Sequence, residues 1–216
     1  MLVYRIVLLL ALIGGIWFYI SAKKKRPDLF SDLGKWIQSQ WNHTIAKLKD
    51  WHNLSLEDSF SITRQFVFVL ALLSFLILAL TGFIPVIITG HHLGGFLLVV
   101  HVIAAPIFIL SIGVLAVLAA HYFRFDKEDW TSIKSAILDE DSSKEKLRLF
   151  WRKLLYWIIL LLSLPVAMSI VLSMYPIFGT DGQEILLTIH RYSTLLIAFA
   201  VLAYSYLVTL QSKQNA

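Results

Sequence analysis

Residues 65–123 contain no Asp, Glu, Lys or Arg, and no other feature restricts the possible folds of this chain as strongly. Two further uncharged stretches cover residues 154–180 and 192–212. A helix needs about 20 apolar residues to cross a bilayer, so residues 65–123 are long enough for two crossings. Hydrophobic residues make up 58% of the 216 residues, which is too many for a soluble domain. We therefore expect an integral membrane protein.

The apolar stretches predict an all-α membrane protein with about five membrane-spanning helices. We place these helices near residues 2–20, 65–88, 93–121, 154–174 and 185–210. The last four form a four-helix transmembrane bundle at residues 63–210, and residues 1–22 form an N-terminal anchor. Arg5 before an apolar core also fits a signal peptide, but no convincing cleavage site follows, and the basic run at residues 23–26 is a strong positive stop. We expect the anchor to be retained.

Basic residues concentrate in the two long segments between predicted helices, residues 23–62 and 122–153. The connectors at residues 89–92 and 175–184 contain no Lys or Arg. By the positive-inside rule, both long segments and the tail at residues 211–216 lie in the cytoplasm, and the N-terminus lies outside the inner membrane. The net charge of +5 therefore reflects topology, and we expect no nucleic-acid partner. Arg5 alone weakly opposes this orientation.

Glycine-containing turns mark the tips of two predicted hairpins, at residues 89–92 and 179–182. Within residues 23–62, apolar residues recur at helical spacing between residues 30 and 48. This pattern predicts an amphipathic helix on the inner membrane surface, or equally a helix that packs on a soluble partner subunit. The mixed charges of residues 122–153 favour a solvated loop over a specific docking site.

Two histidines, His101 and His190, lie inside predicted spans, where a polar side chain is costly unless it has a partner. Each lies about six or seven residues from the centre of its helix, or about 10 Å along the helix axis. Both helices run from outside to inside. We therefore expect the two imidazoles at the same level, in the outer half of the bilayer.

Two neutral imidazoles at one level on two bundle helices can bind the iron of a b-type haem from both faces. This arrangement predicts His101 and His190 as the iron ligands. The other ring nitrogen of each needs a hydrogen-bond partner, such as a backbone carbonyl or a nearby hydroxyl of Thr188, Ser193 or Thr194; none can be assigned from sequence. The chain has no cysteine, so it has neither thiolate ligands nor an iron–sulfur cluster held by its own cysteines.

A zinc or copper site, a proton pathway and a purely structural role are the competing explanations for these histidines. A zinc or copper site would need a larger set of converging ligands. A proton pathway usually recruits Asp or Glu within the spans. No carboxylate is available at this depth, which favours haem.

Gly94 and Gly95 precede His101 by about two helical turns. Missing side chains there would let a flat macrocycle approach the backbone. Close packing between membrane helices explains the two glycines equally well. Both explanations remain open.

Three further residues could contact the same group. Arg191 could pair with a haem propionate, or it could extend to the outer interface. His91 and His92 belong to the membrane edge, where either could donate a hydrogen bond to a propionate. We expect all three to contact the group, and His91 and His92 are also weaker candidates than His101 for binding its iron.

Several short motifs on the predicted helices point to one family. They are an Arg that opens the span ending in Thr81-Gly82-Phe83, His-x-x-x-Gly at residues 91–95, HYFRFDKED after the third span, Phe150-Trp151 before the fourth, and His190-Arg191 in the last. With these motifs, residues 64–210 resemble the four-helix b-type cytochrome subunits of membrane-bound respiratory enzymes. Examples are the gamma subunit of formate dehydrogenase and the cytochrome b of nickel–iron hydrogenase.

The resemblance implies one haem where the family often has two. The family often carries a second histidine in the last span, about four turns beyond the first, with a partner in the first bundle helix. Tyr204 stands at the first of these positions, and Phe66 and Val67 stand near the second. The implied haem is the outer one, in agreement with the depth of His101 and His190.

The family motif and the depth argument select different ligands. The His-x-x-x-Gly pattern selects His91, whereas depth selects His101. His91 lies ten residues further out, or about 15 Å, which is too far to share one iron with His190. We expect His101 to be the ligand unless the third span begins deeper in the membrane.

These patterns predict a membrane-anchoring cytochrome b subunit that passes electrons between a quinone pool and a partner redox subunit through one haem b. We expect no catalytic residues of its own, a quinone site near the haem or at the inner interface, and a periplasmic cytochrome or iron–sulfur subunit as the partner. One alternative is a haem-free anchor or assembly subunit whose histidines make interhelical hydrogen bonds. Another is a quinone-binding subunit without haem.

Overall fold

The computed structural model describes residues 2–25, 55–91, 93–137 and 144–212, with short pieces at 31, 34–35, 38–39, 41–42 and 45–46. Of these residues, 92% are helical and none lies in a strand. Five of the described helices are long and apolar enough to cross a membrane. The chain is therefore an all-α membrane protein, as predicted. The expected interfacial helix between residues 30 and 48 falls largely outside the described residues.

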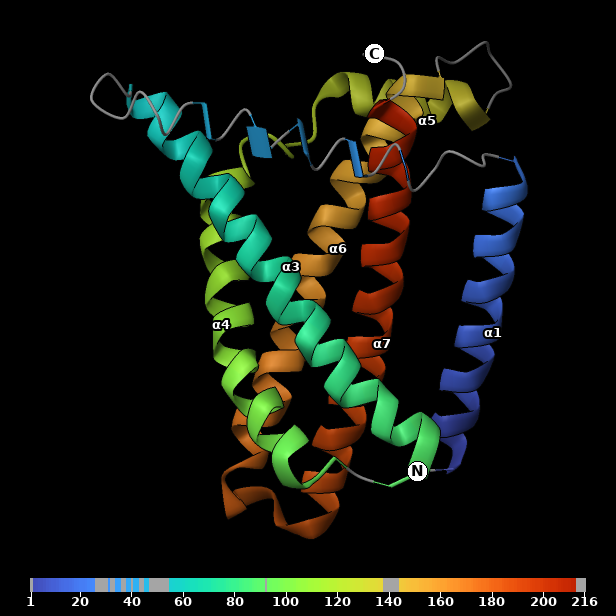
Figure 1. Cartoon of the computed structure of the whole chain (residues 1–216), viewed down its shortest axis with the longest axis vertical. Coiled ribbons are helices and arrows are strands. Elements are labelled where there is room, and N and C mark those ends of the chain that lie inside the picture. Colours follow the sequence, from blue (N-terminus) through green and yellow to red (C-terminus); the bar gives the residue numbers. More distant parts are fainter. Residues whose placement is uncertain are drawn as a thin grey trace. The chain divides into compact units, whose positions relative to one another are not determined.

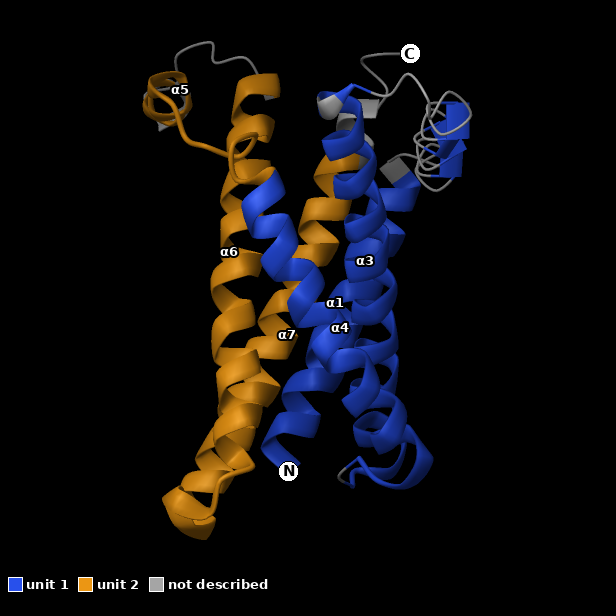
Figure 2. Ribbon diagram, turned by 90° about the vertical axis from the view of Figure 1, so that its left-hand side faces the viewer, with its two compact units in different colours: residues 1–118 blue, residues 119–216 orange. Residues whose placement is uncertain are grey.

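The helices follow one another in the order labelled in Figure 1. They are α1 (Leu2–Lys25), α3 (Leu56–Thr89), α4 (Gly95–Ala119), α5 (Lys127–Ile137), α6 (Lys144–Ser173), the 3₁₀ helix η2 (Pro176–Phe178) and α7 (Gly179–Ser212). The chain divides into two compact units, residues 1–118 and residues 119–216 (Figure 2). The first unit holds the α3–α4 hairpin and the second holds the α6–α7 hairpin, so each contains one of the predicted hairpins.

Several helices begin earlier than their apolar stretches predict. α3 begins at Leu56 because Ser55 caps it: the Ser55 Oγ accepts a hydrogen bond from the N–H of Asp58 at 3.1 Å and donates to Asp58 Oδ2 at 2.7 Å. α6 begins at Lys144, ahead of its apolar stretch. The added turns carry charged and polar residues, so hydropathy alone does not identify them as helical.

The tip of the first hairpin is held by an arginine from the N-terminal helix. α3 ends at Thr89, and Gly90 follows in the left-handed conformation with φ 71°. Arg5 in α1 donates from Nη2 to the carbonyl oxygens of Ile87 at 3.0 Å and Ile88 at 3.5 Å. A positive charge is favourable at the C-terminus of a helix, so Arg5 stabilises the end of α3 and joins α1 to it. This contact explains the position of Arg5 without reference to membrane topology.

The second hairpin turns earlier than the sequence predicted. The chain reverses at Met174, Tyr175 and η2, and residues 179–182 already belong to α7. Pro176 begins η2 with the φ that its ring imposes, and Gly179, with φ 62°, starts the next helix. The prediction that residues 179–182 form the turn is therefore wrong. The structure places the turn at the proline and uses the glycine to enter α7.

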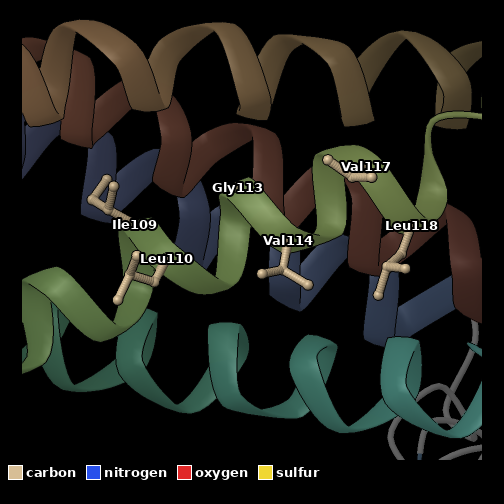
Figure 3. Close-up of a pocket in the computed structure, with 6 residues that line it drawn as sticks. All are labelled: Ile109, Leu110, Gly113, Val114, Val117 and Leu118. Carbon is tan, nitrogen blue, oxygen red and sulfur yellow. The ribbon is translucent and has the colours of Figure 1, made fainter.

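The buried residues of α4 lie on one face of the helix, and its other faces expose large apolar side chains. The buried residues recur every three or four positions: Ala104, Phe108, Ser111, Leu115 and Ala119. Elsewhere on α4, Val117 is 81% exposed and Leu110 is 70% exposed, as a surface in contact with lipid requires. Figure 3 shows a shallow apolar hollow on the exposed side, lined by Ile109, Leu110, Gly113, Val114, Val117 and Leu118.

Candidate functional site

His101 lies in the second turn of α4 and is hydrogen-bonded to α3. Its Nδ1 is 2.8 Å from Oγ1 of Thr81. The same hydroxyl lies 2.7 Å from the carbonyl oxygen of Ile77, one turn earlier in α3. A carbonyl oxygen can only accept, so Thr81 donates its single hydroxyl proton to Ile77 and accepts a proton from His101. Nδ1 of His101 therefore carries the hydrogen, and the lone pair of the neutral ring lies on Nε2.

Gly82 leaves the space that the His101 ring occupies. A Cβ atom at this position would lie 3.4 Å from Cε1 and 3.9 Å from Nδ1 of His101. These distances are ordinary van der Waals contacts, so a methyl group fits against the ring. Thr81 orients the ring, and Gly82 leaves room for it.

His190 has a similar hydrogen bond in the second unit. Its Nδ1 lies 3.2 Å from the backbone carbonyl oxygen of Val166 in α6. Because a carbonyl oxygen can only accept, Nδ1 is the protonated nitrogen of the neutral ring and Nε2 carries the lone pair. Val166 is only 8% exposed, and its carbonyl oxygen also accepts from the hydroxyl of Ser169 at 3.0 Å. The His190 ring is thus oriented by a buried acceptor on the adjacent helix.

The two predicted ligands therefore share one protonation pattern. A histidine that binds a metal usually donates its other ring N–H to a carboxylate, a carbonyl or water, which determines the tautomer. His101 and His190 both donate from Nδ1, to Thr81 and Val166 respectively. The pattern fits imidazole ligands that bind through Nε2. His101 belongs to the first unit and His190 to the second, and each is described with its own neighbours.

Two of the hydroxyl groups near His190 in sequence, those of Thr188 and Thr194, donate to their own helix. Thr188 donates to the carbonyl oxygen of Glu184 at 2.8 Å, and Thr194 donates to that of Arg191 at 2.9 Å. The sequence suggested these threonines as ring partners without assigning one, and it did not suggest Thr81. The sequence does show that Thr81 is a polar residue within an apolar span. However, whether it meets a histidine depends on how α3 is rotated about its axis, which the sequence pattern does not reveal.

Gly94 precedes α4, and Gly95 is the first residue of the helix. Among the described residues, no atom lies within 4 Å of a Cβ placed on either glycine. Gly95 has a φ of 61°, a left-handed conformation that favours glycine where the helix begins. The described residues show no close helix packing at these positions, and the backbone gives Gly95 a local reason to be glycine.

The other predicted contact residues differ in exposure. Arg191 is half-buried beside His190. His91 is exposed in the connection between α3 and α4, and its backbone N–H donates to Oγ1 of Thr89 at 3.2 Å. His92 lies outside the described residues, and the described residues contain no group of three or more His, Cys, Asp or Glu side chains able to hold a metal ion. The histidine favoured by the family motif is thus an exposed one.

Tyr204 occupies the position at which the resembled family often has a second haem ligand, and it is packed against aromatic residues. Its ring lies 6.4 Å from that of Phe123, and the guanidinium carbon of Arg152 lies 5.8 Å from its centroid. Phe123 stacks on Tyr156 with centroids 4.1 Å apart and planes inclined by 12°. The backbone oxygen of Phe123 accepts a hydrogen bond from Trp157 Nε1 at 3.0 Å. Aromatic packing and a cation–π contact therefore surround Tyr204 within its own unit.

Comparison with known proteins adds no relative. The chain matches no protein-family model, no curated protein and no solved structure. The resemblance to b-type cytochrome subunits therefore depends on the short motifs and on the two membrane histidines.

Proposed function

We propose that this protein is a membrane-anchoring b-type cytochrome subunit that passes electrons between a quinone pool and a partner redox subunit. One observation carries the proposal: His101 and His190 each donate Nδ1–H to an acceptor on the neighbouring helix, which leaves the lone pair on Nε2. These two nitrogens would hold one haem b, which supplies reversible one-electron transfer when bound. The proposal requires both rings to reach the same iron.

The residues around the two rings set their properties as ligands. Thr81 and Val166 orient the rings, and a hydrogen bond donated by Nδ1 raises the basicity of Nε2. The apolar helices exclude water from the site. Arg191, half-buried beside His190, has a guanidinium group that can form two parallel hydrogen bonds with a carboxylate such as a propionate.

Charge and depth support the orientation and the kind of partner. The lysines and arginines of residues 23–62 and 122–153 favour a cytoplasmic location for these segments and an outer location for the N-terminus, in the inner membrane. With both histidines in the outer half, a periplasmic cytochrome or iron–sulfur subunit is the easiest partner to reach. A quinone site would lie near the haem or at the inner interface. The aromatic packing of Tyr204 supports a single haem.

A haem-free membrane anchor or assembly subunit is the second candidate. The same two hydrogen bonds favour it, because one joins α3 to α4 and the other joins α6 to α7. Interhelical hydrogen bonds stabilise pairs of membrane helices without any cofactor. A quinone-binding subunit without haem, like the haem-free anchor, would show no b-type band.

Reduced-minus-oxidised spectra of membranes from haem-sufficient cells separate the candidates. We expect a b-type band in the wild type, its loss in His101→Ala and in His190→Ala, and its retention in His91→Ala. His121→Ala is the matched control, because this exposed histidine follows α4 and has no predicted role in ligation. Electron paramagnetic resonance of the oxidised protein should show low-spin iron in the wild type.

Two outcomes would redirect the proposal. If the protein is present in the membrane but no b-type band appears, the cytochrome function is wrong and the anchor function remains. If the band persists in His101→Ala and disappears in His91→Ala, the family motif identifies the ligand and the depth argument does not.

A further inference from the structure

α5 begins with a reciprocal pair of hydrogen bonds. The N–H of Asp129 donates to Oδ1 of Asp126 at 2.9 Å, and the N–H of Asp126 donates to Oδ2 of Asp129 at 2.8 Å. This arrangement is a capping box, with two carboxylates at the positively polarised end of the helix. A helix of 11 residues is marginal by itself in water, so this cap and the tertiary contacts of α5 decide whether it forms.

Lys153 of α6 binds both carboxylates of the cap. Its Nζ lies 2.7 Å from Oδ2 of Asp129 and 3.1 Å from Oδ2 of Asp126. The side chain of Lys153 is 17% exposed and that of Asp129 is 7% exposed, so their ion pair is largely screened from water. The sequence predicted a solvated loop in this region, but the structure shows a helix attached to the start of a membrane span.

The contacts with α6 place α5 at a defined level along the membrane helix. Lys153 is the last charged residue before the uncharged stretch at residues 154–180, and Phe150, whose ring centroid lies 6.3 Å from that of Trp130, precedes Lys153 by three residues. At about 1.5 Å per residue, both contacts lie within about 6 Å of the start of the uncharged stretch. α5 extends across this end of α6 (Figures 1 and 2).

One side of α5 carries an aromatic residue and two basic residues, and the opposite side carries Glu128. Trp130 remains 63% exposed despite its contact with Phe150. At about 100° per residue, the exposed Lys127 and Lys134 flank Trp130 on the helix surface. Glu128, with a side chain that is 80% exposed, lies on the opposite side of the helix. This pattern is typical of a helix that lies flat in a membrane interface.

We propose that α5 is an interfacial helix that seats Trp130 in the phospholipid headgroup layer at this end of α6. Trp and Tyr concentrate in this layer because each combines an apolar ring with a polar hydrogen-bonding group. Tyr122, 62% exposed, and Trp151, 47% exposed, also belong to the segments next to this end of α6. Lys127 and Lys134 extend to lipid phosphates.

A protein partner is the other class of occupant for this surface, and two observations favour lipid. The surface lies at the level where α6 becomes uncharged, and lipid headgroups are present there in any membrane. In addition, Lys153 binds the carboxylates of Asp126 and Asp129, which would otherwise be repelled by anionic headgroups. The proposal does not depend on haem binding.

The absence of cysteine makes this proposal directly testable, because one introduced cysteine can carry a spin label without background. The full-length protein with Trp130→Cys is labelled and reconstituted into phosphatidylethanolamine–phosphatidylglycerol vesicles. We expect the label to collide more often with oxygen than with a water-soluble nickel chelate. Glu128→Cys is the matched control, for which the order should reverse; its exposed ion pair with Lys146, at 3.8 Å, contributes little to stability.

Two results would overturn the proposal. Equal access of the nickel chelate to both labels would show that Trp130 faces water. A label at residue 130 that is shielded from both oxygen and nickel would show a protein contact instead of lipid. Ile133→Cys, on the same side of the helix as Trp130, provides a second position if the first variant fails to insert. Lys153→Met should reduce the oxygen preference at residue 130, because it releases α5 from α6.

Discussion

Nδ1 of His101 in α4 lies 2.8 Å from Oγ1 of Thr81 in α3, and this threonine donates its own proton to a carbonyl oxygen within α3. The depth of His101 in its predicted span identified this histidine from the sequence. The sequence did not identify its partner, the hydroxyl of a threonine 20 residues earlier. The contact determines the tautomer of the ring. It therefore determines which ring nitrogen can bind a metal.

Thr81→Val removes the acceptor of the His101 ring while keeping nearly the same size. We expect haem affinity to fall by about 10–100-fold, the usual effect of losing an outer-shell partner of a metal ligand. Haem bound per protein in a titration measures the change. Thr63→Val is the control: Thr63 makes the same type of hydrogen bond, to the carbonyl oxygen of Ser59 at 2.8 Å, at an exposed position of α3. Equal losses in both variants would mean that Thr81 does not orient the ring.

The tautomers can be measured without haem. We expect ¹⁵N chemical shifts of labelled histidine in the haem-free protein to report hydrogen on Nδ1 for both His101 and His190, because each faces an acceptor. Thr81→Val should change the signal of His101 and leave that of His190 unchanged. A wild-type protein with hydrogen on Nε2 of either ring would contradict the proposed ligand geometry, whether or not haem binds.

Substitutions of Gly82 should follow a size threshold. Gly82→Ala adds a Cβ atom 3.4 Å from Cε1 of His101, which is ordinary contact, so we expect haem binding close to the wild-type level. Gly82→Leu extends the side chain into the space of the ring, and we expect a clear loss of bound haem. Spectra of equal amounts of purified protein measure both effects. If the leucine variant binds haem as well as the alanine variant does, the ring is not confined at this point.

Gly90→Ala should destabilise the first unit. Gly90 has a left-handed backbone with φ 71°, which costs an alanine about 1–2 kcal/mol. The new Cβ atom would also lie 2.7 Å from Nη1 of Arg5, so the guanidinium group must move from the end of α3. We expect a lower Tm in detergent. Gly113→Ala is the control, because no described atom lies within 4 Å of its Cβ and alanine favours a helix; an equal decrease in both variants would refute this explanation.

Acid should weaken the attachment of α5 to α6. The backbone N–H of Asp129, followed by the ammonium group of Lys153, holds the pKa of Asp126 below its ordinary value. A carboxyl group with a lowered pKa stabilises the fold above its ordinary pKa of about 3.9, and this contribution disappears as the pH falls through the lowered value. We expect hydrogen exchange in α5, corrected for its intrinsic pH dependence, to accelerate in that range.

Lys153→Met tests the cause of this acid sensitivity. The substitution removes one of the two residues whose interactions lower the pKa of Asp126, so the acceleration should begin at a higher pH. Exchange within α7 serves as the internal reference. Unchanged protection of α5 in both proteins would show that the carboxylates do not hold the helix in place.

The sequence predicted the large features of the fold because they depend on local hydropathy. Five apolar stretches predicted five helices able to cross a membrane, and the glycine turn near Gly90 predicted the tip of the first hairpin. It failed where charged residues continue a helix, as at Lys144 in α6, and where a mixed-charge segment becomes helical through contacts with another element, as in α5. The N-cap of α3 at Ser55 depends only on neighbouring residues, but a hydropathy pattern does not reveal it.

The sequence by itself therefore determined that this is an all-α membrane protein, because a bilayer requires long uncharged helices. It also determined the number and order of the membrane helices and the presence of two histidines within them. The tertiary structure decided that Thr81 and Val166 orient these histidines and that Arg5 meets the end of α3. These contacts join residues on different helices. They depend on how each helix is rotated about its axis and shifted along it, and hydropathy does not encode either quantity.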